Sequence, residues 1–214
     1  MRPLLFFIKK EENAMAFVNS NAAGRHGQFQ SSRLKATDVG RIFDALMVED
    51  ASAETKTYID CDNGVPVVTR GFVTTTGLQE VYAEIAKTTD KIAVTGDVAL
   101  VKDARIKRDE VPSNWYRKAG VPIKTYEVLD DDYEVFAVAD YQFTDASVAN
   151  IKVGAYVVTD GNGMWVAQAA APDATKVGFI GKIHSLQTDR FNLSADGKHM
   201  TTIVRIQCVQ NKQL

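Results

Sequence analysis

Short runs of alternating apolar and polar residues recur along this chain, and glycine-containing turns separate them. The turn signals are Asp62-Asn63-Gly64, Asp160-Gly161-Asn162-Gly163 and Asp196-Gly197. Asn-Gly and Asp-Gly favour the positive φ angles that tight hairpins need. Alternation between such turns is typical of half-buried strands. The pattern therefore predicts a mainly β fold, an antiparallel β-barrel or sandwich of short strands.

The expected strands cover residues 41–48, 57–60, 65–68, 80–86, 97–101, 123–128, 133–143, 155–158, 164–167, 177–186 and 199–209. Residues 80–86 alternate only in part and also fit one short helix. Pro66 cannot donate to a strand ladder, so its strand lies at a sheet edge or begins there. Gly178 and Gly181 interrupt their strand and indicate a bulge. No amphipathic helix longer than about 12 residues is visible, although helices usually form about a third of a globular protein.

The segments 123–128 and 133–143 are expected to pair as a hairpin around the acidic turn of residues 129–132. Together the strands place a β-rich domain at residues 38–214. A stretch of this length can bury the core of one sizeable β domain or of two small ones.

The first 14 residues do not fit an export signal or a membrane anchor. Their apolar run is about five residues long, whereas a signal peptide needs roughly 7–15 and a membrane span about 20. Residues 10–13, Lys-Glu-Glu-Asn, can be encoded by a purine-rich stretch that resembles a bacterial ribosome-binding site, and Met15 follows at a suitable distance. We therefore expect residues 1–14 to be an upstream extension and Met15 to be the natural start, in a gene of a bacterium or a bacterial virus.

Residues 15–37 are expected to form an extended N-terminal arm. The stretch from residue 16 to 35 holds no acidic side chain and no apolar period of either kind. Two interpretations stay open, a disordered tail and an arm that orders when it binds a partner. In the second, the candidate contacts are Arg25, Phe29 and Arg33.

The amino-acid composition indicates which classes of partner to expect and in which compartment the protein is made. The chain has 214 residues, is 45% hydrophobic and 24% charged, and carries a formal net charge of −2. It therefore lacks the composition of a disordered chain and the basic excess of a nucleic-acid binder, and we expect neither nucleic acid nor membrane as a partner. Cys61 and Cys208 lack a C-x-x-C motif and are expected to be buried thiols, with a disulfide between them left open. So few cysteines fit synthesis in a reducing cytoplasm.

No catalytic or metal-binding constellation stands out. The three histidines, His26, His184 and His199, form no H-x-x-x-H pair. The acidic run 130–132 lacks the alternating ligands of an EF-hand loop, and no G-x-S-x-G elbow is present. We therefore expect no catalytic residue, no metal and no cofactor. A hydrolase built on two acids that meet across a cleft remains an open alternative, because nothing selects a pair.

The longest irregular stretch, residues 102–120, mixes basic and acidic side chains with two adjacent aromatic residues. Long loops inside a compact domain are often functional, and Trp and Tyr are enriched at binding hot spots. The candidate partner-binding residues here are Arg108, Trp115, Tyr116 and Arg117. Trp165 lies in an expected strand and is interpreted as a core residue.

Two segments carry a family resemblance. The first is Asp97-Val98-Ala99-Leu100-Val101 with the charged loop that leads to Asn114-Trp115-Tyr116-Arg117-Lys118-Ala119-Gly120. The second is Ile123-Lys124-Thr125-Tyr126-Glu127-Val128 followed by Asp132-Tyr133-Glu134-Val135-Phe136. This order resembles the capsid decoration proteins of tailed bacteriophages, also called cement or auxiliary head proteins, and covers roughly residues 38–209.

The resemblance implies a non-enzymatic virion structural protein that is made in the bacterial host cytoplasm. Such a protein binds the exterior of an assembled capsid and stabilises contacts between major capsid subunits. The implied partner is the major capsid protein, and self-association as a dimer or trimer is also expected. The alternative is a β module of a phage tail or a bacterial surface that binds a carbohydrate or a receptor. Only the pair Trp115-Tyr116 supports that alternative in the sequence.

Overall fold

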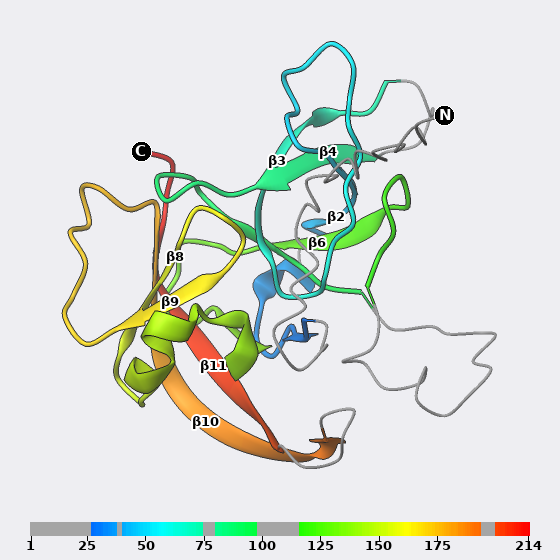
Figure 1. Cartoon of the computed structure of the whole chain (residues 1–214). Coiled ribbons are helices and arrows are strands. Elements are labelled where there is room, and N and C mark those ends of the chain that lie inside the picture. Colours follow the sequence, from blue (N-terminus) through cyan, green and yellow to red (C-terminus); the bar gives the residue numbers. More distant parts are fainter. Residues whose placement is uncertain (1–26, 38–39, 75–79, 98–115, 194–199) are drawn as a thin grey trace, which may run out of the picture.

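The structure is a computed structural model that describes residues 27–37, 40–74, 80–97, 116–193 and 200–214. Over these residues the chain forms a closed five-stranded barrel beside a six-stranded antiparallel sheet (Figure 1). The expected mainly β fold is therefore confirmed.

The barrel strands follow one another around the ring in the order β2-β4-β3-β5-β6. Their bounds are β2 Ile42–Met47, β3 Pro66–Phe72, β4 Val81–Ile85, β5 Ala93–Thr95 and β6 Ile123–Glu127. The pair β2–β4 is parallel and the other neighbours are antiparallel. Small side chains such as Ala45 and Ala83 share the interior with Val67 and Ile123. Pro66 begins its strand as expected, and residues 81–85 are a strand rather than a helix.

The sheet has the strand order β1-β7-β11-β10-β8-β9. Its strands are β1 Phe29–Gln30, β7 Val135–Ala139, β8 Tyr156–Thr159, β9 Trp165–Gln168, β10 Phe179–Leu193 and β11 Met200–Asn211. The hairpin β8–β9 turns through Asp160, whose carboxylate accepts hydrogen bonds from the backbone N–H groups of Asn162 and Met164. The bulge expected at Gly181 is present as a shift in the β10–β11 register.

The helices among the described residues are short 3-10 helices: η1 Lys35–Thr37, η4 Asp140–Gln142 and η5 Asp145–Asn150. The segment that contains η5 covers the outer edge of β9. The backbone N–H of Thr144 donates to the Trp165 carbonyl, and the Asn150 amide donates to the Ala167 carbonyl. This cover removes one exposed sheet edge.

The prediction that residues 123–143 form a hairpin is wrong. Strand β6 pairs with β2 and β5 in the barrel, whereas β7 pairs with β1 and β11 in the sheet. The acidic segment between them is therefore a crossing from one layer to the other. Alternation identifies strands but does not say which strand a segment pairs with, because pairing depends on distant residues. The expected strand 133–143 also ends at Ala139, where η4 begins.

Two further expectations differ from the structure. Residues 57–60 make only an isolated bridge, between Tyr58 and Val48. Strand β5 was not expected, because its three residues are too short to show a period. Of the strand expected over 97–101, residues 98–101 lie outside the described part of the chain.

The two layers share one apolar core. The rings of Phe136, Trp165 and Phe179 pack at centroid distances of 5.4 to 6.1 Å, and Ile92 and Val94 from the barrel join them. Trp165 is fully buried, as its strand position indicated. Apolar burial on this scale is the main stabilising term of a fold.

Buried amide side chains join the barrel to the sheet within this core. The amide of Asn211 on β11 accepts from the N–H of Ile92 and donates to the carbonyls of Ile92 and Val128. The amide of Gln142 accepts from the N–H groups of Gln28 and Ala139. It also donates to the Asn63 carbonyl.

The two cysteines are free and buried, which confirms the expected buried thiols. Burial raises the pKa of the Cys208 thiol to about 12, and it raises the pKa of Cys61 as well. Neither group has the low pKa that makes a cysteine reactive.

The last residues of the expected arm, 27–37, are integrated into the domain. Strand β1 pairs with β7 through Phe29 and Gln30, and Leu34 and Ala36 are buried in the shared core. Residues 15–26 lie outside the described part of the chain.

Candidate functional site

The structure describes four of the seven residues expected to bind a partner. Arg25, Arg108 and Trp115 lie outside the described residues. Phe29, Arg33, Tyr116 and Arg117 are described, and they are not gathered in one place. Phe29 and Arg33 belong to the β1 side of the sheet, whereas Tyr116 and Arg117 lie beside the barrel.

Arg117 holds a loop end against the barrel. Its backbone N–H and carbonyl exchange two hydrogen bonds of 2.8 Å with the backbone of Cys61. Its guanidinium forms an ion pair with the carboxylate of Asp97, with an Nε–Oδ2 distance of 3.1 Å. Tyr116 beside it is half-buried. These contacts give Arg117 a structural role, and partner binding by this pair stays a prediction.

Phe29 packs inside the molecule. Its ring lies 5.0 Å from the ring of Tyr126 and 6.4 Å from that of Phe136, between centroids. A Cβ on Gly96 would meet Cδ1 of Phe29 at 2.0 Å, so the glycine makes room for the ring. This packing between sheet and barrel explains the residue without any partner.

Arg33 lies in a groove of about 570 Å³ that crosses strands β7, β11 and β10. The lining residues are Ser32, Arg33, Asp132, Tyr133, Val135, His184, Ser185, Arg205 and Gln207. Alternation along β11 builds its floor. Val204, Ile206 and Cys208 point into the core, so Arg205 and Gln207 point to the groove face.

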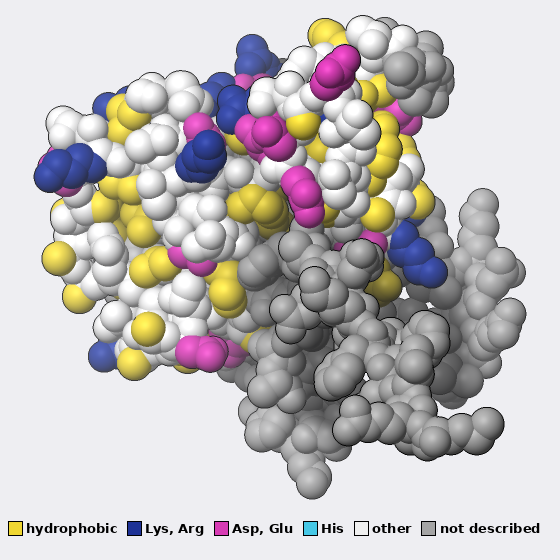
Figure 2. All heavy atoms as spheres, turned by 45° about the horizontal axis from the view of Figure 1, so that its top comes forward, with side chains coloured by type: hydrophobic (Ala, Val, Ile, Leu, Met, Phe, Trp, Pro, Cys, Tyr) yellow, Lys and Arg dark blue, Asp and Glu magenta, His cyan; other side chains and the backbone are white. Residues whose placement is uncertain are grey.

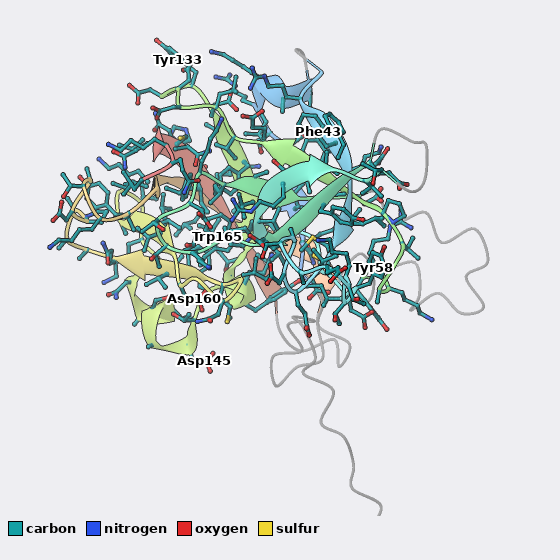
Figure 3. The ribbon with its side chains drawn as sticks, turned by 90° about the horizontal axis from the view of Figure 1, so that it is seen from above. Phe43, Tyr58, Tyr133, Asp145, Asp160 and Trp165 are labelled. Carbon is teal, nitrogen blue, oxygen red and sulfur yellow. The ribbon has the colours of Figure 1, made fainter. Side chains whose placement is uncertain are left out.

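Hydrogen bonds position the long polar side chains of the groove. The Arg205 guanidinium donates to the Gln187 side-chain oxygen at 2.6 Å, and the Gln207 amide donates to the Asp132 carbonyl at 2.6 Å. The N–H of Tyr133 donates to the Asp131 carboxylate at 2.8 Å, and the side chain of Tyr133 is 76% exposed. In Figure 3 it projects away from the body of the molecule. The groove therefore presents an accessible aromatic ring beside fixed donors.

The β1 wall of the groove is fastened by Lys35 at the start of η1. Its backbone N–H donates to Oε1 of Glu134 at 2.9 Å, and its ammonium group pairs with Asp131. The hydrogen bond from Lys35 lowers the pKa of Asp131. Glu134 is fully buried, and this burial raises its pKa because it disfavours the charged form.

Ser32 in the same wall has a φ of 44°. Among the described residues it is the one non-glycine residue in the left-handed region. Such conformations cost free energy and persist where the surrounding contacts impose them. The backbone N–H of Arg33 donates to the Val135 carbonyl at 2.8 Å, so Arg33 and Lys35 both hold this wall of the groove to its neighbours.

Charge in the groove favours an anionic group. Arg33 and Arg205 contribute two guanidinium groups, and Asp132 is the one carboxylate among the lining residues. A guanidinium matches a carboxylate in a bidentate geometry. On the face in Figure 2 the basic and acidic side chains of the described residues are interspersed with hydrophobic ones.

A second groove, of about 680 Å³, lies between the barrel and the β8–β9 turn. Glu84 in its lining forms an ion pair with Arg70 and accepts a hydrogen bond from the N–H of Ala51. Asp50 accepts hydrogen bonds from the N–H and the hydroxyl group of Ser52. The lining holds no aromatic side chain, so this groove offers a protein partner less than the one on the sheet.

The described residues contain neither a cluster of metal-ligating side chains nor a helix that could span a membrane. No three His, Cys, Asp or Glu side chains among them lie close enough to hold a metal ion. None of their helices is long and apolar enough to cross a membrane.

No protein-family model, no curated protein and no solved structure matches this chain. The groove is therefore interpreted from its own residues. Of the groove residues, Arg33 was predicted from the sequence as a partner-binding residue, whereas Tyr133, His184 and Arg205 were not. For Arg205 a signal existed, since alternation in β11 sets it opposite the core face. Tyr133 carries no such signal, because its exposure depends on the crossing between the layers.

Proposed function

We propose that this chain is a non-enzymatic virion structural protein that binds the outer surface of an assembled phage capsid and stabilises contacts between major capsid subunits. The observation that carries the proposal is the open groove on the sheet, with two guanidinium groups and an exposed tyrosine. The resemblance of residues 97–136 to decoration proteins supports the capsid as the partner.

The groove suits a segment of another protein. An aromatic anchor and charged donors at an open surface give specificity without a deep pocket. Arg33 and Arg205 would bind a carboxylate of the major capsid protein, and Tyr133 would pack against its apolar neighbour. A single contact of this size is weak, but many copies on one lattice act together. Nucleic acid and membrane are not among the proposed partners.

Quantitative mass spectrometry of purified virions from the source tests this proposal. Decoration predicts an abundance near that of the major shell protein. Complete absence from the particles would overturn the proposal.

Occupancy of the shells by variants then tests the groove. We expect Tyr133→Ala combined with Arg205→Glu to reduce occupancy at least tenfold. The control is Lys176→Glu, a charge change at a side chain that is 80% exposed and does not line the groove. Equal occupancy of both variants would exclude the groove as the capsid site.

A second candidate is a phage tail or surface β module that binds a carbohydrate or a receptor. The exposed ring of Tyr133 favours it, because sugars stack on aromatic faces and the neighbouring Ser185 and Gln207 can hydrogen-bond hydroxyl groups. An abundance of only a few copies per particle would favour this second candidate. Binding to a glycan array that is lost in Tyr133→Ala would establish it.

A further inference from the structure

Strand β10 has an unpaired outer edge within the described residues. Strand β8 covers that edge at Gly181 and Lys182, and Ile183 exchanges two hydrogen bonds with Gly154 and Ala155. From His184 onward the pairings of β10 are with β11, on its other side. Figure 1 shows the outer side of β10 at the border of the molecule.

The central part of this edge, residues 184–188, lacks the usual protection. Natural proteins guard exposed edges with charged residues, proline, bulges or a covering segment. The stretch from His184 to Thr188 holds no Lys, Arg, Asp, Glu or Pro, and the charged pair Asp189-Arg190 follows it. Register shifts lie at both ends of this stretch, near His184 and between Asp189 and Leu193. An open edge of this composition accepts another strand.

The two faces of the free edge are self-complementary. Directly paired residues in antiparallel strands point to the same face. Leu186 pairs with Val204 and so lies on the core face, where it is 38% exposed. Ser185 pairs with Arg205 and lies on the groove face, as does Gln187, which accepts a hydrogen bond from Arg205.

We infer that β10 pairs antiparallel with β10 of a second copy of this chain, about a two-fold axis that is perpendicular to the sheet and passes at Leu186. In this register Leu186 faces its own copy, and Ser185 faces Gln187 of the other copy. Over residues 184–188, beyond the part of the edge that β8 covers, no like charges meet, and the exposed Leu186 side chains of the two copies cover each other. The contact is isologous, as in most homodimers.

The pairing has a consequence for the groove. A two-fold axis perpendicular to the sheet keeps both groove faces on the same side. His184 and Ser185 line the groove and also lie on the pairing edge. The dimer therefore presents two grooves side by side, across one continuous sheet. This inference stands apart from the proposed function, because it requires no particular ligand.

Cross-linking of the full chain tests the pairing. Facing Cβ atoms in such a pair lie about 4.5–5.5 Å apart, close to the separation that a disulfide spans. We expect Leu186→Cys to form a reducible dimer under mild oxidation, because Cys61 and Cys208 are buried. The control is Val121→Cys, at an apolar side chain with a similar exposure of 43%. Equal cross-linking of both variants would reveal mere collision and overturn the inference.

Sedimentation equilibrium over a range of concentrations supplies a second test without oxidation. We expect a reversible dimer whose dissociation constant rises at least tenfold in Leu186→Lys and stays the same in Val121→Lys, with circular dichroism to confirm that both are folded. A chain that stays monomeric to millimolar concentration would overturn the inference. A dimer insensitive to Leu186→Lys would do the same.

Discussion

The indole N–H of Trp165 donates a hydrogen bond of 2.9 Å to the carbonyl of Gly64, across 101 residues of sequence. Trp165 belongs to β9 of the sheet, and Gly64 lies in the turn that leads into β3 of the barrel. Figure 3 shows Trp165 between the two layers. The turn predicted from Asn63-Gly64 is thus a docking point between barrel and sheet.

Gly64 is expected to be irreplaceable at this joint. Its φ is 77°, and a Cβ there would lie 2.2 Å from Nε2 of Gln142. Gly64→Ala therefore combines left-handed strain of roughly 1–2 kcal/mol with a clash in a packed core. We expect a large fall in the thermal unfolding midpoint, measured by circular dichroism.

Gly120→Ala is the matched control, because Gly120 has the same φ of 77° and open space around the added Cβ. It should show the strain cost alone. Similar unfolding midpoints for Gly64→Ala and Gly120→Ala would contradict the proposed role of Gly64 in the contact between the barrel and the sheet.

Gln142→Ala should destabilise the protein by about 2–4 kcal/mol, since it leaves the N–H groups of Gln28 and Ala139 and the Asn63 carbonyl without their partner. Urea unfolding measures the change. Gln168→Ala, at a half-buried position on β9, is the comparison and should cost under about 1 kcal/mol. A loss no greater than that of the comparison would show that water replaces these bonds.

Truncation of the arm should have two distinct outcomes. Deleting residues 16–26 leaves β1 and η1 in place, so we expect an intact fold, and weaker capsid binding if Arg25 contacts the partner. Deleting residues 16–35 also removes Phe29, Leu34 and the Lys35 contacts, so we expect loss of cooperative unfolding. Near-ultraviolet circular dichroism and thermal melts distinguish the two. An intact fold after the longer deletion would show that residues 27–35 add little.

The buried Glu134 should make stability depend on pH in one direction. Its pKa is raised in the folded state above the ordinary value of 4.5, so folding favours the protonated form. Its contribution is most favourable below about pH 4.5 and is lost as the pH rises through the folded-state pKa. Glu134→Gln removes the titration and keeps an oxygen to accept from the N–H of Lys35.

We therefore expect Glu134→Gln to gain stability relative to the wild type as the pH rises from 4 to 8, by urea unfolding at each pH. The pKa of Asp131 is lowered in the folded state, so its contribution to stability changes with pH in the opposite direction, but Asp131 is present in both proteins and its contribution cancels in the comparison. A constant difference between the two proteins would contradict the raised pKa.

Local signals predicted part of this fold. The β8–β9 hairpin could be predicted because Asp160 and the glycines after it form the turn within a few residues. Strand β11 could be predicted from its alternation. The placement of β6 in the barrel and β7 in the sheet could not be predicted, because β6 closes the barrel with β2, some 80 residues earlier. For the groove, the outward position of Arg205 follows from alternation, whereas its meeting with Arg33 depends on β1 pairing with β7.

The position of β11 in the sheet bears on how the protein is made. It lies between β7 and β10 and carries Asn211, which ties the sheet to the barrel. The ribosome releases these residues after all the other described strands. A nascent chain that ends before them has neither the middle of its sheet nor this tie, and leaves Phe136 and Phe179 without their cover. The sheet therefore cannot be completed before β11 has been synthesised, and the unfinished chain needs protection from aggregation until that strand inserts.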